Sequence, residues 1–334
     1  MSACGGTPAA TSWVGASAGE DTVYVAYTNR VTAVRVNDGS MAWQYPAESS
    51  GQRVFYASPE PTDGQVVVGD YSFKLVGLDA ANGSEKWSFD RSKGRYVGGF
   101  LAVDGTILAP SADHTLYALN DQGEFLWEFT TGNALWARPA SDGELVFQPS
   151  MDHNLYALQL TDGTQAWKTD LGGAAVYSPI LSEDGVLYLG TMANEVLAIQ
   201  ASDGSVLWRF EAGGAIWTRP VLHEGSLYFG DIQGNIYSVD PQSGDTNWRV
   251  ETGDTVVGSP GILPDGLVFV SEKGNVLEIG FDGQRLWTQT ISGKLYTSPQ
   301  VFEDRIVVPV TQGEQLLVAF DFKGNVIWNF APPK

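Results

Sequence analysis

The sequence predicts an all-β fold, an eight-bladed β-propeller built from four-stranded antiparallel blades. Three observations predict it. A Gly-x-x-x-Trp motif occurs eight times, its copies recur every 41 residues or so, and each copy contains four short β-branched or aromatic runs separated by Gly, Asp, Asn or Pro. No helical periodicity interrupts the pattern. We therefore expect one propeller domain over residues 12–330, preceded by a tether (1–11) and followed by a C-terminal tail (331–334).

The glycine and the tryptophan keep the same spacing in every repeat. The eight pairs are Gly39/Trp43, Gly83/Trp87, Gly123/Trp127, Gly163/Trp167, Gly204/Trp208, Gly244/Trp248, Gly283/Trp287 and Gly324/Trp328. A residue that is present in every blade cannot mark one binding site. We therefore predict that these eight tryptophans are structural.

Within a repeat, each strand has its own signal. A Ser-Pro-like element opens the first strand, as at Ser178-Pro179, and a run such as 186–189 follows an acidic-Gly turn. A third run, such as 155–158, follows a polar turn, and the fourth strand carries the tryptophan. The first repeat opens with an inner-strand-like run, and the last ends with its outer strand. No strand is left over to be exchanged for ring closure.

Composition excludes several classes of protein. The chain has 334 residues, 39 acidic and 19 basic, and a formal net charge of −20. A nucleic-acid partner is not expected, because binding phosphates takes clustered Lys and Arg. Hydrophobic residues make up 43%, enough for a core, but no stretch approaches the roughly 20 apolar residues of a membrane-spanning helix. The one cysteine, Cys4, leaves no intrachain disulfide.

A small residue stands ten positions before many of the tryptophans, with Asp, Asn or Ser and then Gly between them. Ala157 precedes Trp167 in this way, and Ala198 precedes Trp208. The pattern resembles the tryptophan-docking motif of the PQQ-like β-propeller repeat family, and the resemblance covers nearly the whole chain. It implies that each indole packs against the neighbouring blade. It says less about activity, because propellers have many functions.

Two branches of that family differ in function. Quinoprotein dehydrogenases bind pyrroloquinoline quinone (PQQ) and calcium in the central funnel, often beside a vicinal cysteine pair, which the single Cys4 excludes here. Their calcium carboxylates and catalytic Asp find no residue-by-residue match in this sequence. The BamB-like lipoproteins of outer-membrane assembly are eight-bladed scaffolds without a catalytic site, and this chain is similar to them in length, blade count and N-terminus. The resemblance therefore implies a non-enzymatic scaffold without a cofactor, and the alternative is a propeller that binds PQQ with calcium or another small ligand.

The N-terminus suggests a lipid anchor. Residues 1–6 resemble the end of a lipobox, in which small residues precede a cysteine that is acylated. We expect Cys4 to be the lipidation site of a monomeric periplasmic or cell-surface lipoprotein, with a protein partner in the cell envelope and membrane contact only through the anchor. The alternative is an incidental free cysteine on a chain that folds in the cytoplasm.

One repeat position is unusually aromatic. Nine residues after the docking tryptophans from Trp87 on stand Tyr96, Trp136, Val176, Trp217, Val257 and Tyr296. Alignment places Trp13 and Tyr56 there in the first two blades, so six of eight blades are aromatic at this position, and Tyr177 stands one residue past it in blade five. These side chains are expected at one mouth of the central channel, where they would bind a small molecule or a protruding aromatic or peptide segment. The alternative is that they pack between blades as core.

Two arginines accompany the aromatic position. Arg138 and Arg219 stand two residues after Trp136 and Trp217, so each should lie on the same face of its strand as that tryptophan. A guanidinium can clamp a carboxylate of a ligand or partner. The alternative is a salt bridge to a neighbouring Asp or Glu.

No catalytic or metal site is predicted. His114 and His153 occupy equivalent turns and His223 a different one, which indicates turn chemistry. The sequence has no nucleophile elbow, phosphate loop, zinc-protease motif or EF-hand spacing, and the acidic turns are expected to be solvated. Three functions therefore remain open: an envelope scaffold, a ligand-binding propeller and, less favoured, an extracellular sensor domain.

Overall fold

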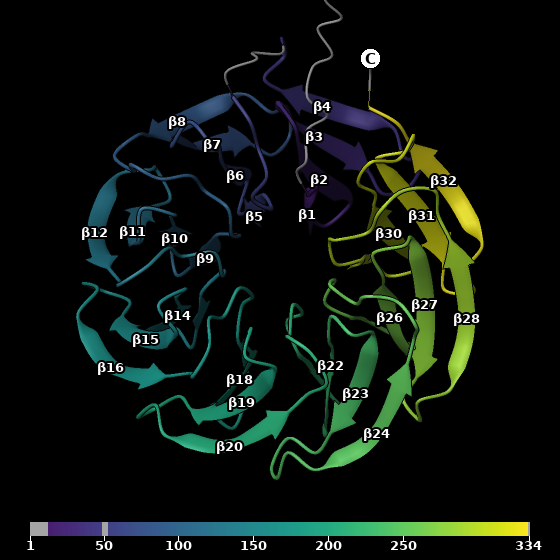
Figure 1. The fold of residues 1–334 in the computed structure, drawn as a ribbon. Coiled ribbons are helices and arrows are strands. Elements are labelled where there is room, and N and C mark those ends of the chain that lie inside the picture. Colours follow the sequence, from purple (N-terminus) through teal and green to yellow (C-terminus); the bar gives the residue numbers. More distant parts are fainter. Residues whose placement is uncertain (1–12, 49–52, 333–334) are drawn as a thin grey trace, which may run out of the picture.

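Four consecutive strands pair in chain order to form each blade, and eight such blades follow one another around a ring (Figure 1). The structure, a computed structural model, describes residues 13–48 and 53–332. The predicted eight-bladed, all-β propeller is confirmed. None of these residues forms a helix that could cross a membrane.

The strand bounds of blades one to four are β1 (Gly15–Ala18), β2 (Thr22–Tyr27), β3 (Arg30–Arg35), β4 (Met41–Tyr45), β5 (Glu60–Thr62), β6 (Gln65–Gly69), β7 (Leu75–Asp79), β8 (Glu85–Phe89), β9 (Leu101–Val103), β10 (Thr106–Pro110), β11 (Thr115–Asn120), β12 (Phe125–Thr130), β13 (Ala140–Ser141), β14 (Leu145–Pro149), β15 (Asn154–Gln159) and β16 (Gln165–Asp170). Those of blades five to eight are β17 (Ile180–Leu181), β18 (Val186–Gly190), β19 (Glu195–Gln200), β20 (Val206–Glu211), β21 (Val221–His223), β22 (Ser226–Gly230), β23 (Asn235–Val239), β24 (Thr246–Glu251), β25 (Gly261–Leu263), β26 (Gly266–Val270), β27 (Asn275–Gly280), β28 (Arg285–Thr290), β29 (Gln300–Val301), β30 (Arg305–Pro309), β31 (Leu317–Asp321) and β32 (Val326–Phe330).

The middle two strands of each blade are buried on both faces, and the outer strand is buried on one. In blade five, the central residues of β19 are fully buried, whereas β20 alternates between exposed and half-buried residues. Continuous β-branched runs suit the first environment and alternation suits the second.

Each outer strand has a bulge next to its docking tryptophan. In seven blades a small residue of the third strand pairs directly opposite the tryptophan, as Ala198 does with Trp208. Blade seven departs from this pattern, because Glu278 stands opposite Trp287. Burial raises the pKa of the Glu278 carboxyl. A small residue is therefore the rule opposite the indole but not a requirement for the bulge.

Each docking indole lies on the motif glycine of the next blade. A Cβ added to Gly163 would stand 2.5 Å from Trp127 Cε3, and Gly163 has φ +74°, so both space and backbone conformation require glycine. The Trp127 indole N–H donates to the Leu160 carbonyl oxygen at 2.9 Å. Six other docking indoles donate to backbone carbonyls in the same way, at 2.8–3.0 Å. Trp87 instead donates to the Gln65 side chain, which in turn donates to the Asp121 carbonyl.

The docking tryptophans differ in burial, which the uniform motif does not predict. Trp43, on β4, is 7% exposed and lies on Gly83, where a Cβ would stand 2.6 Å from its Cε3. Trp248, on β24, and Trp287, on β28, are only half-buried. A Cβ on the glycine beneath either of these two indoles would stand 3.0 Å from the ring. Blades six and seven thus hold their indoles less deeply than blade one does.

Hydrogen bonds keep these three indoles in the docked position all the same. The Trp43 N–H donates to the Ala80 carbonyl at 2.9 Å. The Trp248 N–H donates to the Phe281 carbonyl at 2.8 Å, and the Trp287 N–H donates to the Phe322 carbonyl at 3.0 Å. In each case the acceptor belongs to the next blade, so all three tryptophans link neighbouring blades.

The ring closes through side-chain packing between blade eight and blade one. The Trp328 indole lies on Gly39 and donates to the Val36 carbonyl at 2.8 Å. The Arg305 guanidinium donates to the carbonyls of Val36 and Asn37, both at 2.9 Å. Within the described residues each blade keeps its own four strands, so closure uses the same docking contact as the other junctions.

The core is divided among the eight blade junctions. Each junction holds one cluster of buried residues contributed by two adjacent blades, such as Leu189 and Phe147 between blades four and five. Full burial of such side chains contributes about 1.5–3 kcal/mol each. Every blade therefore depends on both neighbours.

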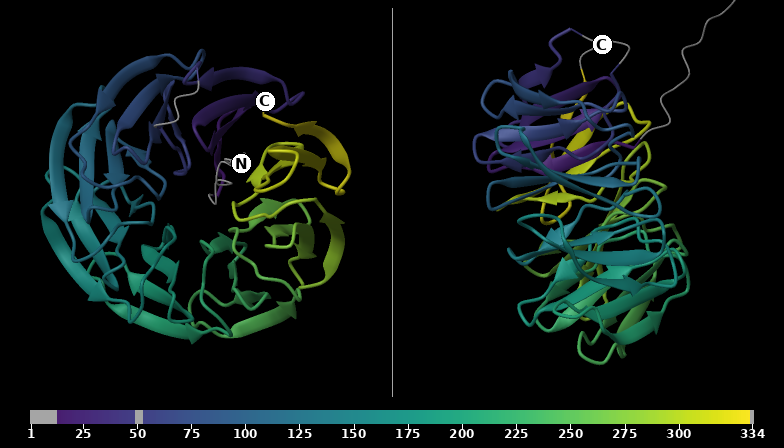
Figure 2. Two further views of the ribbon diagram at one scale, coloured as in Figure 1. Left: turned by 45° about the horizontal axis from the view of Figure 1, so that its top comes forward. Right: turned by 90° about the vertical axis from the view of Figure 1, so that its left-hand side faces the viewer.

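Two kinds of connection share one face of the ring, which we call the mouth face. One kind runs from an outer strand to the inner strand of the next blade, and the other joins the second and third strands of a blade. Hydrogen bonds link them, for example Ala112 N–H to the Arg95 carbonyl and Thr131 N–H to the His114 carbonyl. Figure 2 shows the ring obliquely and from the side, with the connections along the edges of the disc.

Candidate functional site

The candidate mouth residues lie in the mouth-face connections, four residues before the inner strand in blades two to eight and two residues before β1 in blade one. The eight equivalent positions hold Trp13, Tyr56, Val97, Trp136, Val176, Trp217, Val257 and Tyr296. Trp13 is 47% exposed and Trp136 is 39% exposed, while Tyr56, Trp217 and Tyr296 are half-buried. Several large rings at equivalent positions on one face would form a contiguous apolar patch, and such patches mark interaction sites.

The structure does not place Tyr96 at the mouth, where the sequence predicted it. It is fully buried in the core between blades two and three, where its ring contacts Phe100 edge-on at 5.7 Å. The connection after Trp87 is one residue longer than those of the blades that follow. Counting nine residues from Trp87 therefore reaches Tyr96, one residue before the true mouth position. The backbone identifies the true equivalents, because Tyr96 N–H and Leu135 N–H donate to corresponding carbonyls, and Val97 takes the mouth position.

The docking tryptophans lie on outer strands and stand apart from the mouth residues. Trp43, Trp248 and Trp287 contact the next blade through a carbonyl and a glycine, as described above. None of the eight lines the polar pocket that Asp254, Glu272 and Lys294 help to form on the mouth face. Trp248 and Trp287 lie on outer strands, away from the mouth residues, so their half-buried state adds nothing to the candidate site.

The N-terminal tryptophan brings distant blades together. The ring of Trp13, from blade one, contacts Trp217 of blade six edge-on, with 5.8 Å between centroids, and Tyr296 of blade eight at 6.0 Å. The Trp217 indole N–H donates to the Met192 sulfur, which comes from blade five. These four side chains form one apolar cluster across part of the mouth.

A second aromatic pair lies at the mouth between blades two and three. Tyr56 contacts Tyr71 edge-on at 4.3 Å, and the Arg95 guanidinium stacks on the Tyr71 ring at 5.0 Å. Burial raises the pKa of Tyr71, the charge of Tyr56 raises it further, and Arg95 opposes the rise. Tyr177, in blade five, is half-buried, and burial raises the pKa of its hydroxyl to about 12.

Arg138 pairs with a carboxylate of the chain itself. Its guanidinium bonds Glu60 Oε1 at 2.6 Å and Oε2 at 3.3 Å, although Glu60 belongs to blade two and Arg138 to blade four. The side chain passes over Gly99 of blade three, where a Cβ would meet Arg138 Cδ at 3.4 Å. Of the two predicted alternatives, the structure shows the salt bridge for Arg138.

Arg219 has a different environment. Its side chain is exposed, and within residues 13–48 and 53–332 its guanidinium has no hydrogen-bond or ion-pair partner. Desolvation lowers its pKa, and the nearby charge of Arg138 lowers it further, so the group stands among protein atoms while still in contact with solvent. Its own backbone N–H donates to Ser259 Oγ at 2.7 Å. Arg219 is therefore a cation without an ion-pair partner in the described residues, and it is available to an added anion.

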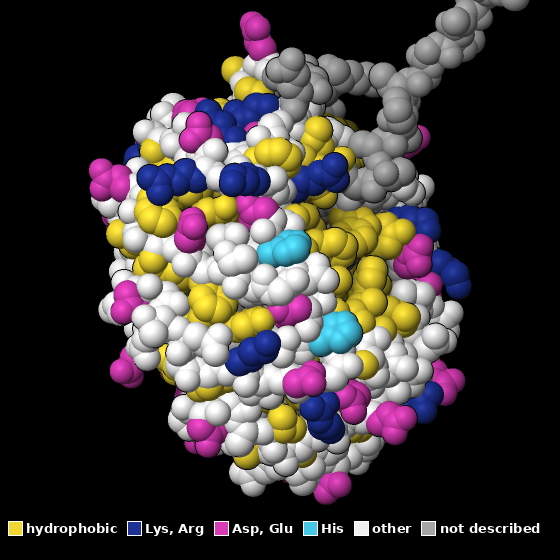
Figure 3. Space-filling model, turned by 60° about the vertical axis from the view of Figure 1, so that its left-hand side comes forward, with side chains coloured by type: hydrophobic (Ala, Val, Ile, Leu, Met, Phe, Trp, Pro, Cys, Tyr) yellow, Lys and Arg dark blue, Asp and Glu magenta, His cyan; other side chains and the backbone are white. Residues whose placement is uncertain are grey.

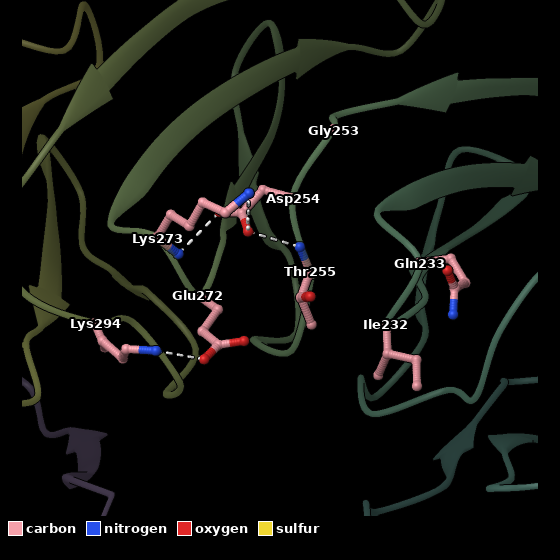
Figure 4. A pocket seen from close by; sticks show the side chains of 8 residues that line it. All are labelled: Ile232, Gln233, Gly253, Asp254, Thr255, Glu272, Lys273 and Lys294. Atoms are coloured by element: carbon pink, nitrogen blue, oxygen red, sulfur yellow. Dashed lines mark hydrogen bonds and ion pairs between the residues drawn. The ribbon is translucent and has the colours of Figure 1, made fainter.

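A polar pocket of about 300 Å³ opens on the mouth face between blades six and eight (Figure 4). Glu272 Oε1 accepts hydrogen bonds from Lys294 Nζ at 2.6 Å and from the Tyr296 hydroxyl at 3.0 Å. The Lys294 bond is the main reason why the pKa of Glu272 lies below its ordinary value. The pocket is lined by charges that already pair with each other.

Sequence reasoning missed Tyr71 and Met192. Both are the second residue of the turn that joins the second and third strands of a blade, where Met151 and Ile232 stand in other blades. An alignment of this turn across the repeats would have shown an apolar position close to the mouth.

The described residues do not gather a metal site. They contain no group of three His, Cys, Asp or Glu side chains that could hold an ion. His114 and His153 occupy left-handed turn positions, with φ +74° and +70°, and His223 stacks on Phe281 at 4.8 Å. Cys4 lies outside the described residues.

Solved structures with the same fold include BamB from Moraxella catarrhalis. It superimposes with a TM-score of 0.79 at 18% identity, covering 93% of this chain and 94% of that one. The computationally designed Ika8 protein superimposes with a TM-score of 0.80 at 11% identity, covering 94% and 98%. These similarities concern the fold.

Three curated relatives match shorter segments. Outer membrane protein assembly factor BamB from Nitrosomonas eutropha is 30% identical over 37% of this chain and 30% of its own length. Tetrathionate hydrolase from Acidithiobacillus ferrooxidans is 39% identical over 17% of this chain and 12% of its length, and the serine/threonine-protein kinase AfsK from Streptomyces griseus is 28% identical over 52% and 22%. This chain thus matches less than a third of the length of these relatives.

A family model covers almost the whole sequence. The model described as outer membrane protein assembly factor BamB matches residues 6–120, 112–255 and 232–333. The eight tryptophan-docked blades agree with this match, and the chain belongs to this BamB family of PQQ-like β-propellers.

Proposed function

We propose that the protein is a non-catalytic scaffold of the cell envelope that binds a protein partner through its mouth face, and that Cys4 anchors it to a membrane. One observation carries the partner-binding proposal. Trp13 and Trp136 expose 47% and 39% of their surface at the mouth, whereas the docking tryptophans Trp127 and Trp328 expose 7% and 9%. Exposed Trp and Tyr side chains are the residue types that dominate binding energy in protein interfaces.

The neighbouring groups suit an interface. The Trp13, Trp217 and Tyr296 rings contact each other and supply a contiguous apolar centre. Charged groups such as Glu272 and Lys294 lie beside it and supply a polar rim. An apolar centre with a polar rim is the usual anatomy of a protein interface. The similarity to outer membrane protein assembly factor BamB supports a protein partner of this kind.

Affinity capture from cell-envelope extracts tests the proposal. The wild-type protein should retain a partner that Trp136→Ala combined with Trp13→Ala loses, while the melting temperature of the variant stays within about 3 °C of wild type. Leu207→Ala, at a 51% exposed position on β20, is the matched control and should retain the partner. Recovery of the same proteins by wild type and the double variant would refute the mouth as the interface.

The anchor is tested separately. Acylation of Cys4 should appear as added mass on the N-terminal peptide, and Cys4→Ala should move the protein from the membrane fraction to the soluble fraction. A cysteine peptide without added mass in membrane-bound protein would refute lipidation.

A second candidate function is binding of a small organic anion in the channel. Arg219 favours it, because its guanidinium has no partner in the described part of the chain while Arg138 is neutralised by Glu60. Titration with pyrroloquinoline quinone, with and without calcium, would follow tryptophan fluorescence. Saturable binding that Arg219→Ala weakens supports this candidate, and an unchanged spectrum rejects the quinone as its ligand.

A further inference from the structure

A strip of three cations crosses the mouth face at the junction of blades two and three. Arg91, Lys93 and Arg95 are all exposed, and the residues between them, Ser92 and Gly94, are buried. The alternation places all three charges on the solvent side of one segment. We call these three residues the basic strip, and Figure 3 shows Lys and Arg side chains in a row on this side of the ring.

The strip runs from the outer edge of the ring towards the channel mouth. At its outer end, the Arg91 guanidinium stacks on the ring of Phe125, from the outer strand β12, at 4.4 Å. At its inner end, Arg95 stacks on Tyr71, which contacts Tyr56 at the mouth. The basic strip therefore reaches the Tyr56 and Tyr71 pair at the mouth.

The backbone beneath the strip is fixed in place. Lys93 N–H donates to Asp113 Oδ2 at 2.7 Å, and Ser92 Oγ donates to the Gly94 carbonyl at 2.9 Å. A Cβ on Gly94 would stand 2.2 Å from the Asp113 nitrogen, so this close approach requires glycine. A segment held in this way presents its charges with little loss of backbone entropy on binding.

The cations of the strip form no ion pair within the described residues. Across residues 13–48 and 53–332, no carboxylate lies within 4.0 Å of the Arg91, Lys93 or Arg95 cationic groups, although the chain has twice as many acidic as basic residues. Asp113, the carboxylate beneath the strip, is bound by the Lys93 N–H and the Tyr117 hydroxyl instead. Three unpaired cations in a protein of charge −20 form a local site for an anion.

We infer that the basic strip is the docking site for an acidic segment of the protein partner, whose carboxylates pair with Arg91, Lys93 and Arg95 while a neighbouring apolar residue contacts Tyr56 and Tyr71. Charge complementarity and continuity with the aromatic mouth favour a peptide. A membrane surface is disfavoured, because polybasic lipid sites contain about four to eight cations and the net charge of −20 repels an anionic leaflet. The inference rests on the proposed scaffold function and names the chemistry of its partner.

Binding of a fluorescein-labelled peptide of alternating glutamate and threonine tests the inference. The strip variant, with Arg91→Glu, Lys93→Glu and Arg95→Glu, should bind it about tenfold more weakly than wild type, because each exposed pair contributes modestly. The matched control, with Lys168→Glu, Arg285→Glu and Lys323→Glu, has the same net charge at exposed positions of other blades and should bind it like wild type. Wild-type binding should weaken as salt is raised.

Three results would overturn the inference: no binding by wild type, equal loss in strip and control variants, or strip-dependent binding to phosphatidylglycerol vesicles without binding of the peptide. If the glutamate variant does not fold, the same three positions changed to Gln replace it. The proposed function fails separately. A partner captured equally well by the strip variant refutes the strip and leaves the scaffold in place, whereas peptide binding without any captured partner refutes the scaffold alone.

Discussion

Two tryptophans nine residues apart, Trp127 and Trp136, should differ sharply in their contribution to stability. Trp127 is 7% exposed, packs on Gly163 and donates to the Leu160 carbonyl at 2.9 Å. Trp136 is 39% exposed, and in the described chain its indole has no hydrogen bond or ring contact. The first side chain belongs to a blade junction and the second to a binding surface.

The magnitudes follow from these contacts. Replacing a buried Trp with Ala costs about 3–5 kcal/mol, and the unpaired Leu160 carbonyl adds about 1 kcal/mol, so Trp127→Ala should lower the free energy of unfolding by about 4–6 kcal/mol. Trp136→Ala removes a ring that is largely in solvent and should cost about 1 kcal/mol. Urea unfolding followed by circular dichroism measures both values. Equal losses, or a larger loss for Trp136→Ala, would refute the division into docking and mouth tryptophans.

Three further predictions concern glycine, an ion pair and pH. Gly163→Ala should destabilise the protein more than Gly105→Ala in urea unfolding, because both have positive φ but only Gly163 lies against an indole, and equal effects would contradict the docking geometry. A double-mutant cycle of Arg138→Ala and Glu60→Ala should give a coupling free energy of about 1 kcal/mol, and additive effects would show that the ion pair is not formed in solution. Burial opposes the charged form of Asp152, but hydrogen bonds from the Tyr156 hydroxyl, the Asn154 amide and the Gly132 N–H outweigh it and lower its pKa. The stability that this carboxylate contributes is therefore present above its unfolded pKa of about 3.9 and is lost as pH falls through the lower folded pKa. Asp152→Asn should make the free energy of unfolding less dependent on pH below about pH 4. An unchanged acid-unfolding profile would contradict this.

Repetition explains why the fold could be predicted from the sequence. A Gly-x-x-x-Trp pair in every repeat fixes one contact per blade junction, and Trp328 on Gly39 closes the ring by that same contact. The sequence shows a small residue ten positions before most of the tryptophans. The structure explains this spacing, because the small residue pairs directly opposite the tryptophan beside the bulge. The depth of each indole was not visible, since Trp43 and Trp248 share the motif and differ in burial.

The site could be predicted only in part, because side-chain environment depends on local insertions and on contacts between distant blades. One extra residue after Trp87 places Tyr96 in the core, a shift that counting from the tryptophan does not detect. The Arg138 pairing with Glu60 spans two blades over Gly99, and no local pattern encodes it. The unpaired state of Arg219 likewise follows from the arrangement in space.

Site-specific photo-crosslinking in intact cell envelopes tests the central claim most directly. A photoreactive amino acid at position 136, at the exposed mouth, is compared with one at position 207, on the exposed outer strand β20. If the mouth face binds a protein, the photoreactive residue at position 136 should crosslink to a discrete partner, and the one at position 207 should not. Crosslinks from Leu207 alone, or no crosslink from Trp136 in correctly localised protein, would contradict the claim that the mouth face binds a protein.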